Sequence, residues 1–136
     1  MRFVDTNILL YAISKDRRDA AKSRQALTLL DAEDLVLSTQ VLQEFYVQAT
    51  RPTRKDALPH ELAANLIEAW RRFPVQEVNA DIVVAALSTK LRWNIDYWDA
   101  AIVEAARAAR CSEILSEDLQ DGMNFGGIRV RNPFTP

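Results

Sequence analysis

Cysteine, histidine and glycine are scarce in this 136-residue sequence, and their scarcity excludes several kinds of site. Cys111 is the single cysteine, which rules out an internal disulfide framework and a cysteine zinc site. His60 is the single histidine, so a histidine-based triad would depend on one residue at an expected helix start. All three glycines follow residue 121, so no glycine-rich phosphate loop follows the first predicted strand. Dinucleotide-binding and P-loop functions are therefore excluded.

The sequence also lacks long apolar runs and an excess of charge of one sign. The longest apolar runs are about six residues, whereas a membrane-spanning helix needs roughly 20. Asp5 and Asn7 interrupt the N-terminal apolar segment, which argues against a signal peptide. With 17 basic and 19 acidic residues the net charge is −2, so binding to nucleic acid by bulk positive charge is not expected. A cytoplasmic protein without membrane association is the simplest interpretation.

Short apolar segments alternate with helical patterns along the chain, which is typical of a parallel sheet covered by helices on both faces. Strands are predicted at residues 3–4, 35–37, 75–78, 113–116 and 128–130. Helical patterns occupy residues 8–13, 20–30, 39–49, 59–73, 79–91 and 96–110. We therefore expect the α/β class, as a three-layer α/β/α sandwich with a short-stranded, mostly parallel sheet. The length predicts a single domain, residues 1–136.

Two sets of apolar side chains carry more specific predictions. The helix that Asn79 is expected to cap has a predicted buried face, comprising Ile82, Val83, Ala86, Leu87 and Leu91. The three tryptophans, Trp70, Trp93 and Trp98, are expected to be core or dimer contacts rather than platforms on which bases stack.

The stretch 3–7 places an acid where a predicted buried strand ends and a helix begins. Phe3 and Val4 belong to the strand, and an apolar helical run starts at Ile8. Ligands of parallel α/β sheets bind at the carboxyl edge of the strands, which makes Asp5 a candidate functional acid. Asp and Thr are also favoured N-cap residues, so helix capping explains Asp5 equally well on this stretch alone.

Three more acids lie in comparable positions. Glu44 follows the second strand, Asp99 lies in the first turn of an alanine-rich helix, and Asp118 follows the strand at 113–116. Each has a structural explanation as well. Glu44 could lie on a solvated flank of its helix, Asp99 could form a capping box with Asp96, and Asp118 could belong to a polar turn. Gathered at one sheet edge, however, such carboxylates would repel one another unless a cation lay among them. Oxygen ligands favour Mg²⁺ or Mn²⁺, which suits phosphoryl chemistry.

Four short motifs follow one another over nearly the whole chain. They are Phe3-Val4-Asp5-Thr6-Asn7, Gln43-Glu44-Phe45, Tyr97-Trp98-Asp99-Ala100-Ala101-Ile102 and Leu115-Ser116-Glu117-Asp118-Leu119. In this order they resemble the PIN-domain ribonucleases, and most closely the VapC-type toxins of bacterial toxin–antitoxin pairs. Several motifs in one order make the resemblance far more specific than any one of them.

The resemblance implies an Mg²⁺- or Mn²⁺-dependent endoribonuclease that cuts tRNA or another structured RNA. The family's acidic quartet is matched by Asp5, Glu44, Asp99 and Asp118, of which Glu44 is the less certain metal ligand. Its small polar residues, which steady the acids or a bound water, are matched by Thr6, Asn7 and Ser116. Such toxins are held inactive by a co-expressed antitoxin and usually form homodimers.

Two further acids fit the family's pattern loosely. Asp96 lies where a small hydroxyl residue is expected, and it would raise the pKa of Asp99 or join the metal shell. Asp121 is expected at most as a ligand through water. With Asp5 assigned to the metal, capping of the first helix is expected to pass to Thr6 or Asn7.

Arg51, Arg54 and Lys55 are the candidate RNA-binding residues. Without the acidic quartet, 17 basic residues face 15 acidic ones, so the remaining surface is mildly basic. Contacts from such side chains to phosphates give a salt-sensitive affinity with little sequence information. An ordinary solvated face explains the same cluster equally well.

Two other functions use the same residues. In the first, the chain is a non-catalytic partner-binding module with the PIN-like fold, and the acids are caps and surface groups. In the second, the metal site hydrolyses small phosphate esters, although the sequence has no loop that would grip the phosphate.

Overall fold

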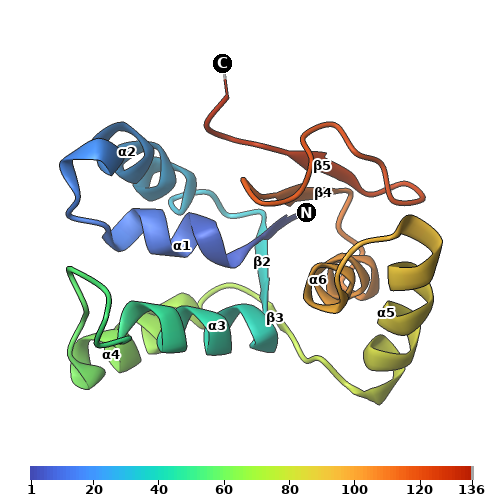
Figure 1. The fold of residues 1–136 in the computed structure, drawn as a ribbon, viewed down its shortest axis with the longest axis horizontal. Helices are drawn as coiled ribbons and strands as arrows, with labels where there is room; N and C mark the ends of the chain where they lie inside the picture. Colours follow the sequence, from blue (N-terminus) through green and yellow to red (C-terminus); the bar gives the residue numbers. More distant parts are fainter. Residues whose placement is uncertain (136) are drawn as a thin grey trace.

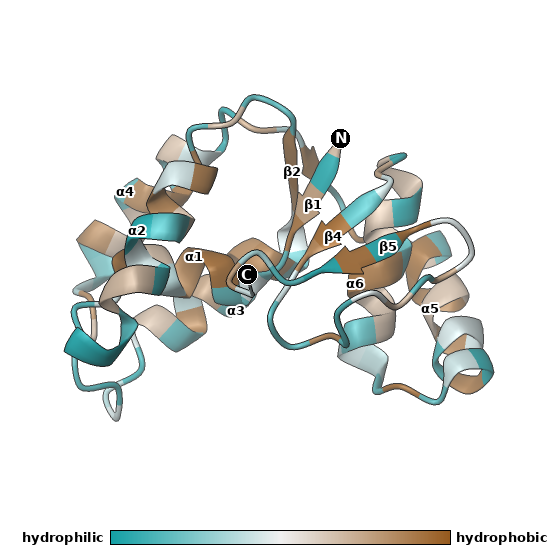
Figure 2. Ribbon diagram, turned by 90° about the horizontal axis from the view of Figure 1, so that it is seen from above, coloured by the Kyte–Doolittle hydropathy of each residue, from teal (hydrophilic) through white to brown (hydrophobic). Residues whose placement is uncertain are grey.

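A five-stranded parallel sheet lies between two groups of helices in the computed structural model, which describes residues 1–135 (Figures 1 and 2). The strands are β1 (Arg2–Val4), β2 (Leu35–Ser38), β3 (Val75–Gln76), β4 (Glu113–Leu115) and β5 (Arg129–Arg131). The helices are α1 (Thr6–Ile13), α2 (Ala20–Leu29), α3 (Thr39–Ala49), α4 (His60–Trp70), α5 (Ala80–Trp93) and α6 (Tyr97–Ala108), with a 3-10 turn at Arg17–Asp19. Helices α1 to α4 lie on one side of the sheet and α5 and α6 on the other. This confirms the predicted three-layer α/β/α sandwich.

The order of the strands places β1 at the centre of the sheet. The order is β3-β2-β1-β4-β5, and Phe3 of β1 lies opposite Val36 on one side and Ile114 on the other. Phe3 and Val4 are fully buried, as expected for a strand with both faces covered. Because the strands are parallel, their carboxyl ends share one edge. The backbone N–H of Asp5 donates to the Leu115 carbonyl across that edge, at 3.0 Å.

Side-chain caps fix where four of the helices begin. Ser38, Asn79 and Asp96 each accept a hydrogen bond from a backbone N–H in the first turn of α3, α5 and α6. Helix α1 is capped by Asp5, whose Oδ1 accepts from the Thr6 backbone N–H at 2.7 Å. The expectation that capping passes to Thr6 or Asn7 is therefore wrong. A carboxylate has two oxygens, so Asp5 caps with one and keeps the other for a different contact.

The main core is built from the strands and the helix faces that cover them. Figure 2 shows hydrophobic residues both along the strands and on the helices beside them. On the α1 to α4 side, Phe45 of α3 is fully buried and packs edge-on against Trp70 of α4, with ring centroids 4.7 Å apart. Among residues 1–135, no helix has both the length and the apolar character needed to cross a membrane.

Helix α5 differs from its prediction in which side chains it buries. Ile82 and Ala86 are buried, but Leu87 is 52% and Leu91 is 82% exposed. Its neighbour α6 covers one face, so apolar side chains on the rest of the helix stay in solvent. Trp98 at the start of α6 is 65% exposed and is not a core residue, whereas Trp70 is buried as expected.

Replacement of Phe45 by Ala should destabilise the fold strongly, because it removes a fully buried ring and its contact with Trp70. The expected loss is about 3–5 kcal/mol of unfolding free energy. The matched control is Val47→Ala on the same helix, since Val47 is 55% exposed and its loss should change stability by only about 0.5 kcal/mol. Urea denaturation measures both, and equal effects would contradict the assignment of Phe45 to the core.

Candidate active site

The Asp5 carboxylate lies buried where β1 and β4 end. Its Oδ2 accepts hydrogen bonds from the Ser116 hydroxyl at 2.7 Å and from the Asn7 side-chain amide at 3.3 Å. Together with the cap to Thr6, three donors hold the group in one orientation. A buried carboxylate needs such donors, since leaving it unpaired would cost several kcal/mol.

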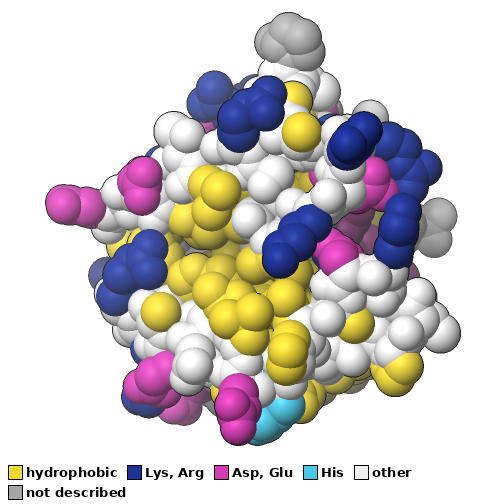
Figure 3. Space-filling model, turned by 90° about the vertical axis from the view of Figure 1, so that its left-hand side faces the viewer, with side chains coloured by type: hydrophobic (Ala, Val, Ile, Leu, Met, Phe, Trp, Pro, Cys, Tyr) yellow, Lys and Arg dark blue, Asp and Glu magenta, His cyan; other side chains and the backbone are white. Residues whose placement is uncertain are grey.

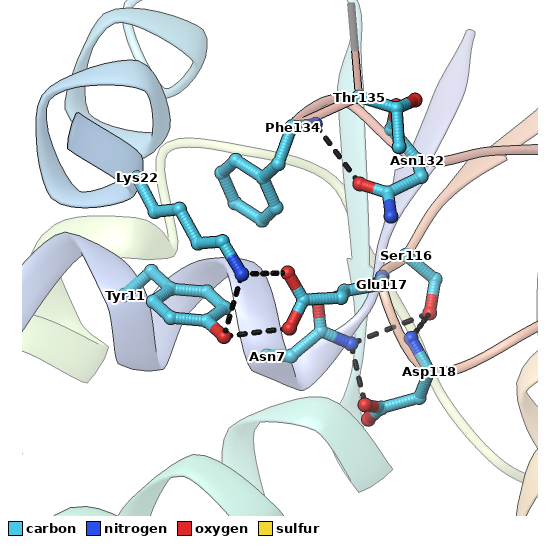
Figure 4. Close-up of polar contacts among 9 residues, drawn as sticks. All are labelled: Asn7, Tyr11, Lys22, Ser116, Glu117, Asp118, Asn132, Phe134 and Thr135. Atoms are coloured by element: carbon cyan, nitrogen blue, oxygen red, sulfur yellow. Dashed lines mark hydrogen bonds and ion pairs between the residues drawn. The ribbon is translucent and has the colours of Figure 1, made fainter. Parts of the chain in front are cut away.

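Asn7 contacts the segment that follows β4 (Figure 4). It also donates to Asp5 and so connects that residue with the segment. Its Nδ2 lies 3.3 Å from the Ser116 hydroxyl and 3.2 Å from Asp118 Oδ2, and its Oδ1 accepts from the Glu117 backbone N–H at 3.1 Å. The Ser116 hydroxyl also accepts from the Asp118 backbone N–H at 3.1 Å. One amide side chain on α1 therefore sets the conformation of the segment that carries Asp118.

Glu44 and Asp99 reach the same edge from helices on opposite sides of the sheet. Glu44 on α3 is half-buried, and its two oxygens accept from the Thr6 hydroxyl at 3.2 Å and from Gln40 Nε2 at 2.6 Å. Asp99 lies in the first turn of α6, where its backbone N–H donates to Asp96 at 2.8 Å. Asp96 is thus the cap of α6, as the capping-box interpretation expects.

Neighbouring acids affect the pKa values of Asp5 and Asp99. Burial, followed by the charges of Asp118 and Glu44, raises the pKa of Asp5 to about 7, even though Ser116 and Thr6 favour the ionised form. Burial and then the adjacent Asp96 raise the pKa of Asp99 to about 6, with smaller effects of Asp118 and Glu44. The expected influence of Asp96 on Asp99 is therefore present. The structure brings Asp5, Glu44, Asp99 and Asp118 into one electrostatically coupled cluster.

The chemistry of this cluster fits a hard divalent cation. All of its charged donors are oxygens, and the pKa values of Asp5 and Asp99 are raised first by burial and then by neighbouring carboxylates, both of which a bound cation would offset. Within residues 1–135, no three His, Cys, Asp or Glu side chains are already arranged to enclose a metal ion. Instead the Asn7 amide lies between Asp5 and Asp118 and donates to both.

A second polar cluster, not expected from the sequence, braces the segment after β4 (Figure 4). Glu117 accepts from Lys22 of α2 and from the Tyr11 hydroxyl of α1, each at 2.6 Å. Burial alone would raise the pKa of Glu117, but these two hydrogen bonds lower it. The Tyr11 ring packs edge-on against Phe134, with centroids 5.0 Å apart, and Lys22 lies over both rings. Glu117 separates Ser116 from Asp118, so the cluster fixes both neighbours.

The remaining predicted site residues lie outside the acidic cluster. The Asp121 carboxylate accepts from the Asn132 backbone N–H at 2.9 Å and so secures the C-terminal segment. Arg51 and Lys55 are exposed, and Arg54 is paired with Asp56 at 2.9 Å. Arg54 nevertheless lines a small hollow together with Asn7 and Asp118, which brings one of the three basic residues beside the acids.

Comparisons with known proteins give one matching family and several solved structures of the same fold. The family model described as PIN domain matches residues 2–120. A toxin–antitoxin complex from Klebsiella pneumoniae contains a chain of the same fold, with a TM-score of 0.73, 20% identity and 98% of each chain covered. VapC20 of Mycobacterium tuberculosis, described as a sarcin–ricin loop cleaving toxin, also has a similar fold. The TM-score is 0.66 at 21% identity, and 87% of this chain and 90% of that chain are covered.

A third solved structure, VapBC2 from Rickettsia felis bound to a fragment of its promoter DNA, also has this fold. The TM-score is 0.66 at 15% identity, and 96% of this chain and 97% of that chain are covered. No curated protein sequence matches the chain significantly. The match to the family model covers most of the chain and both strand ends at which Asp5 and Asp118 lie.

The raised pKa of Asp5 predicts how the stability of the metal-free protein changes with pH. Between its usual value of 3.8 and about 7, folded Asp5 keeps a proton that the unfolded chain releases, so the unfolding free energy falls as the pH rises over this range and levels off above about 7. Asp5→Asn cannot ionise. The unfolding free energy of this variant, measured by urea denaturation in EDTA, should therefore rise relative to that of the wild type between pH 5 and pH 8.

The matched control for this measurement is Asp81→Asn, which changes an exposed acid in the first turn of α5. Its difference from the wild type should be the same at pH 5 and pH 8. A constant difference for Asp5→Asn as well would contradict the raised pKa.

Proposed function

Because this chain belongs to the PIN-domain family, we propose that it is a metal-dependent endoribonuclease of the VapC type, the toxin of a toxin–antitoxin pair. The observation that carries the proposal is the meeting of Asp5, Glu44, Asp99 and Asp118 at the carboxyl edge of the sheet, where the charges of Glu44 and Asp118 add to the effect of burial in raising the pKa values of Asp5 and Asp99. The solved relatives described as toxins or toxin–antitoxin complexes support it at the level of the fold.

We assign Mg²⁺ or Mn²⁺ to this cluster, with Asp5, Asp99 and Asp118 as the ligands and Glu44 as a further oxygen donor. When bound, such an ion polarises a phosphate oxygen and lowers the pKa of a bound water. The protein's contribution is orientation: Ser116 and Asn7 hold Asp5, while Thr6 and Gln40 hold the two oxygens of Glu44. Asp121 remains a candidate only for a contact through water.

For the substrate we propose a structured RNA such as tRNA, bound mainly through its phosphates. Arg54 lies on the hollow that contains Asn7 and Asp118, so its guanidinium is close enough to support a phosphate beside the acids. Arg51 and Lys55 are exposed nearby in sequence and extend the same basic segment. The near-neutral net charge means that these local groups, rather than bulk charge, would attract RNA.

The proposed partners are an antitoxin protein and a second copy of the chain, within the cytoplasm. Figure 3 shows apolar side chains gathered in a hollow on the face over α1, α2 and α4, with charged groups around it. Leu27 of α2 is 53% and Leu62 of α4 is 46% exposed on these helices. Exposed apolar surface of this kind is typical of protein-binding faces, which supports an antitoxin as its occupant.

Asp5→Asn and Asp99→Asn should each abolish RNA cleavage and growth inhibition while the fold stays intact. Losing a ligand should reduce kcat by more than the roughly 10- to 100-fold that losing a supporting group costs. Cleavage of total cellular RNA by purified protein measures this, with Asp81→Asn as an active control and circular dichroism as the check on folding. Full activity of either variant, or of the wild type in excess EDTA, would refute the proposal.

Binding of Mn²⁺ gives a readout that does not depend on activity. Titration calorimetry should detect one or more ions on the wild type, none on Asp5→Asn, and an affinity about 10- to 100-fold weaker on Ser116→Ala, because Ser116 only orients Asp5. Absence of binding to the wild type would favour the partner-binding module. Turnover of p-nitrophenyl phosphate without cleavage of RNA would favour the phosphatase.

A further inference from the structure

A solvent-exposed tryptophan borders a hollow beside the acidic cluster. Trp98 is 65% exposed at the start of α6, and the hollow of about 430 Å³ is lined by Gln40, Gln43, Glu44, Val47, Gln48 and Trp98. The Tyr97 ring meets the indole edge-on, with centroids 5.1 Å apart and an angle of 77° between the planes. The indole is therefore supported from one side and open to solvent on another.

The lining of the hollow is chemically suited to a neutral, flat group. Trp98 and Val47 supply apolar surface, and the side-chain amides of Gln43 and Gln48 can both donate and accept hydrogen bonds. Glu44 is the one charged residue among those that line it, with neither lysine nor arginine present. This lining would repel a phosphate but accept an aromatic ring that carries N–H donors and carbonyl acceptors. A nucleobase has these properties, and it stacks well on an indole.

The hollow is also fixed in place relative to the acids. Glu44 belongs both to the hollow and to the acidic cluster, and Trp98 directly precedes Asp99. The buried Gln40 amide donates to Glu44 Oε1 at 2.6 Å and to the Trp98 carbonyl at 3.2 Å. One amide group thus ties a predicted metal ligand to the aromatic wall. An RNA strand whose phosphate lies at the acids would place an adjacent base within reach of this wall.

We propose that this hollow is a subsite for one RNA base next to the cleaved phosphate, with Trp98 as the stacking platform and Gln43 and Gln48 as the groups that read the base edge. The proposal deepens the endoribonuclease function and rests on it for the identity of the substrate. It also revises the expected role of Trp98 as a core or dimer contact. Binding of the base itself needs neither the metal nor the phosphate.

Binding of nucleosides tests the subsite without any cleavage. Adenosine, guanosine, cytidine and uridine are titrated into ¹⁵N-labelled, metal-free protein, and the tryptophan indole N–H signals are followed by NMR. The Trp98 signal should shift with at least one nucleoside, while that of Trp93, which packs on Phe125 away from the hollow, should stay in place. Unchanged Trp98 signals with all four nucleosides at millimolar concentration would overturn the proposal.

Variants of Trp98 then connect the subsite to RNA cleavage. With an RNA of randomised sequence, the wild type should prefer certain bases at one position flanking the cut, and Trp98→Ala should lose that preference and raise KM by about tenfold, as expected for a lost stacking contact. Trp98→Phe, which keeps an aromatic ring, should retain most of the preference. An unchanged profile for Trp98→Ala would overturn the proposal, and a change only in its dimer or antitoxin binding would assign the indole to a protein contact instead.

The nuclease function and the base subsite can be refuted separately. If the wild type cleaves no RNA but nucleosides still shift the Trp98 signal, the base subsite stands and the nuclease function falls. If cleavage depends on Asp5 and Asp99 but not on Trp98, the nuclease function stands and the subsite falls.

Discussion

The burial of one carboxylate between two strand ends is the constraint on which this site depends. Asp5 cannot lie in the core unpaired, so the chain supplies Ser116, Asn7 and the first N–H of α1 as donors. Those donors do not offset the effect of burial, to which the charges of Asp118 and Glu44 add, and the pKa of Asp5 stays raised. The fold therefore holds negative charge together at an energetic cost, which a cation of the proposed kind would relieve.

The shared position of Asp5 and Asp118 follows from the sequence, because it depends only on the order of strands and helices along the chain. The alternation of strands and helices predicts a parallel sheet, and a parallel sheet brings the residues after β1 and β4 to one edge. Asp5 and Asp118 could be placed together on that ground. The contacts of Asn7 with Ser116 and Asp118 could not, since they depend on the register between strands 111 residues apart in the chain.

The differences between prediction and structure concern what a neighbouring element covers. The apolar pattern of α5 is consistent with a wide buried face, but α6 covers only part of it, and Leu91 stays in solvent. The sequence predicts a core or dimer contact for Trp98, and the structure leaves it 65% exposed at the start of α6. Capping of α1 also does not exclude a second role for Asp5, because its two oxygens have separate partners. Lys22 and Glu117 lie 95 residues apart in the chain, so their ion pair could not be predicted from a periodic pattern in the sequence.

The separation of Asp5 from Ser116 has a consequence for the life of the chain on the ribosome. Asp5 is synthesised early, and its donor Ser116 follows 111 residues later. At ordinary rates of translation this delay is on the order of ten seconds. Until β4 has been synthesised, β1 lacks one of its two neighbouring strands, and Asp118 does not yet exist to join the acidic cluster. A nascent chain therefore carries the first acid of the candidate site without the other residues of that site, and the acidic cluster forms only when synthesis is nearly complete.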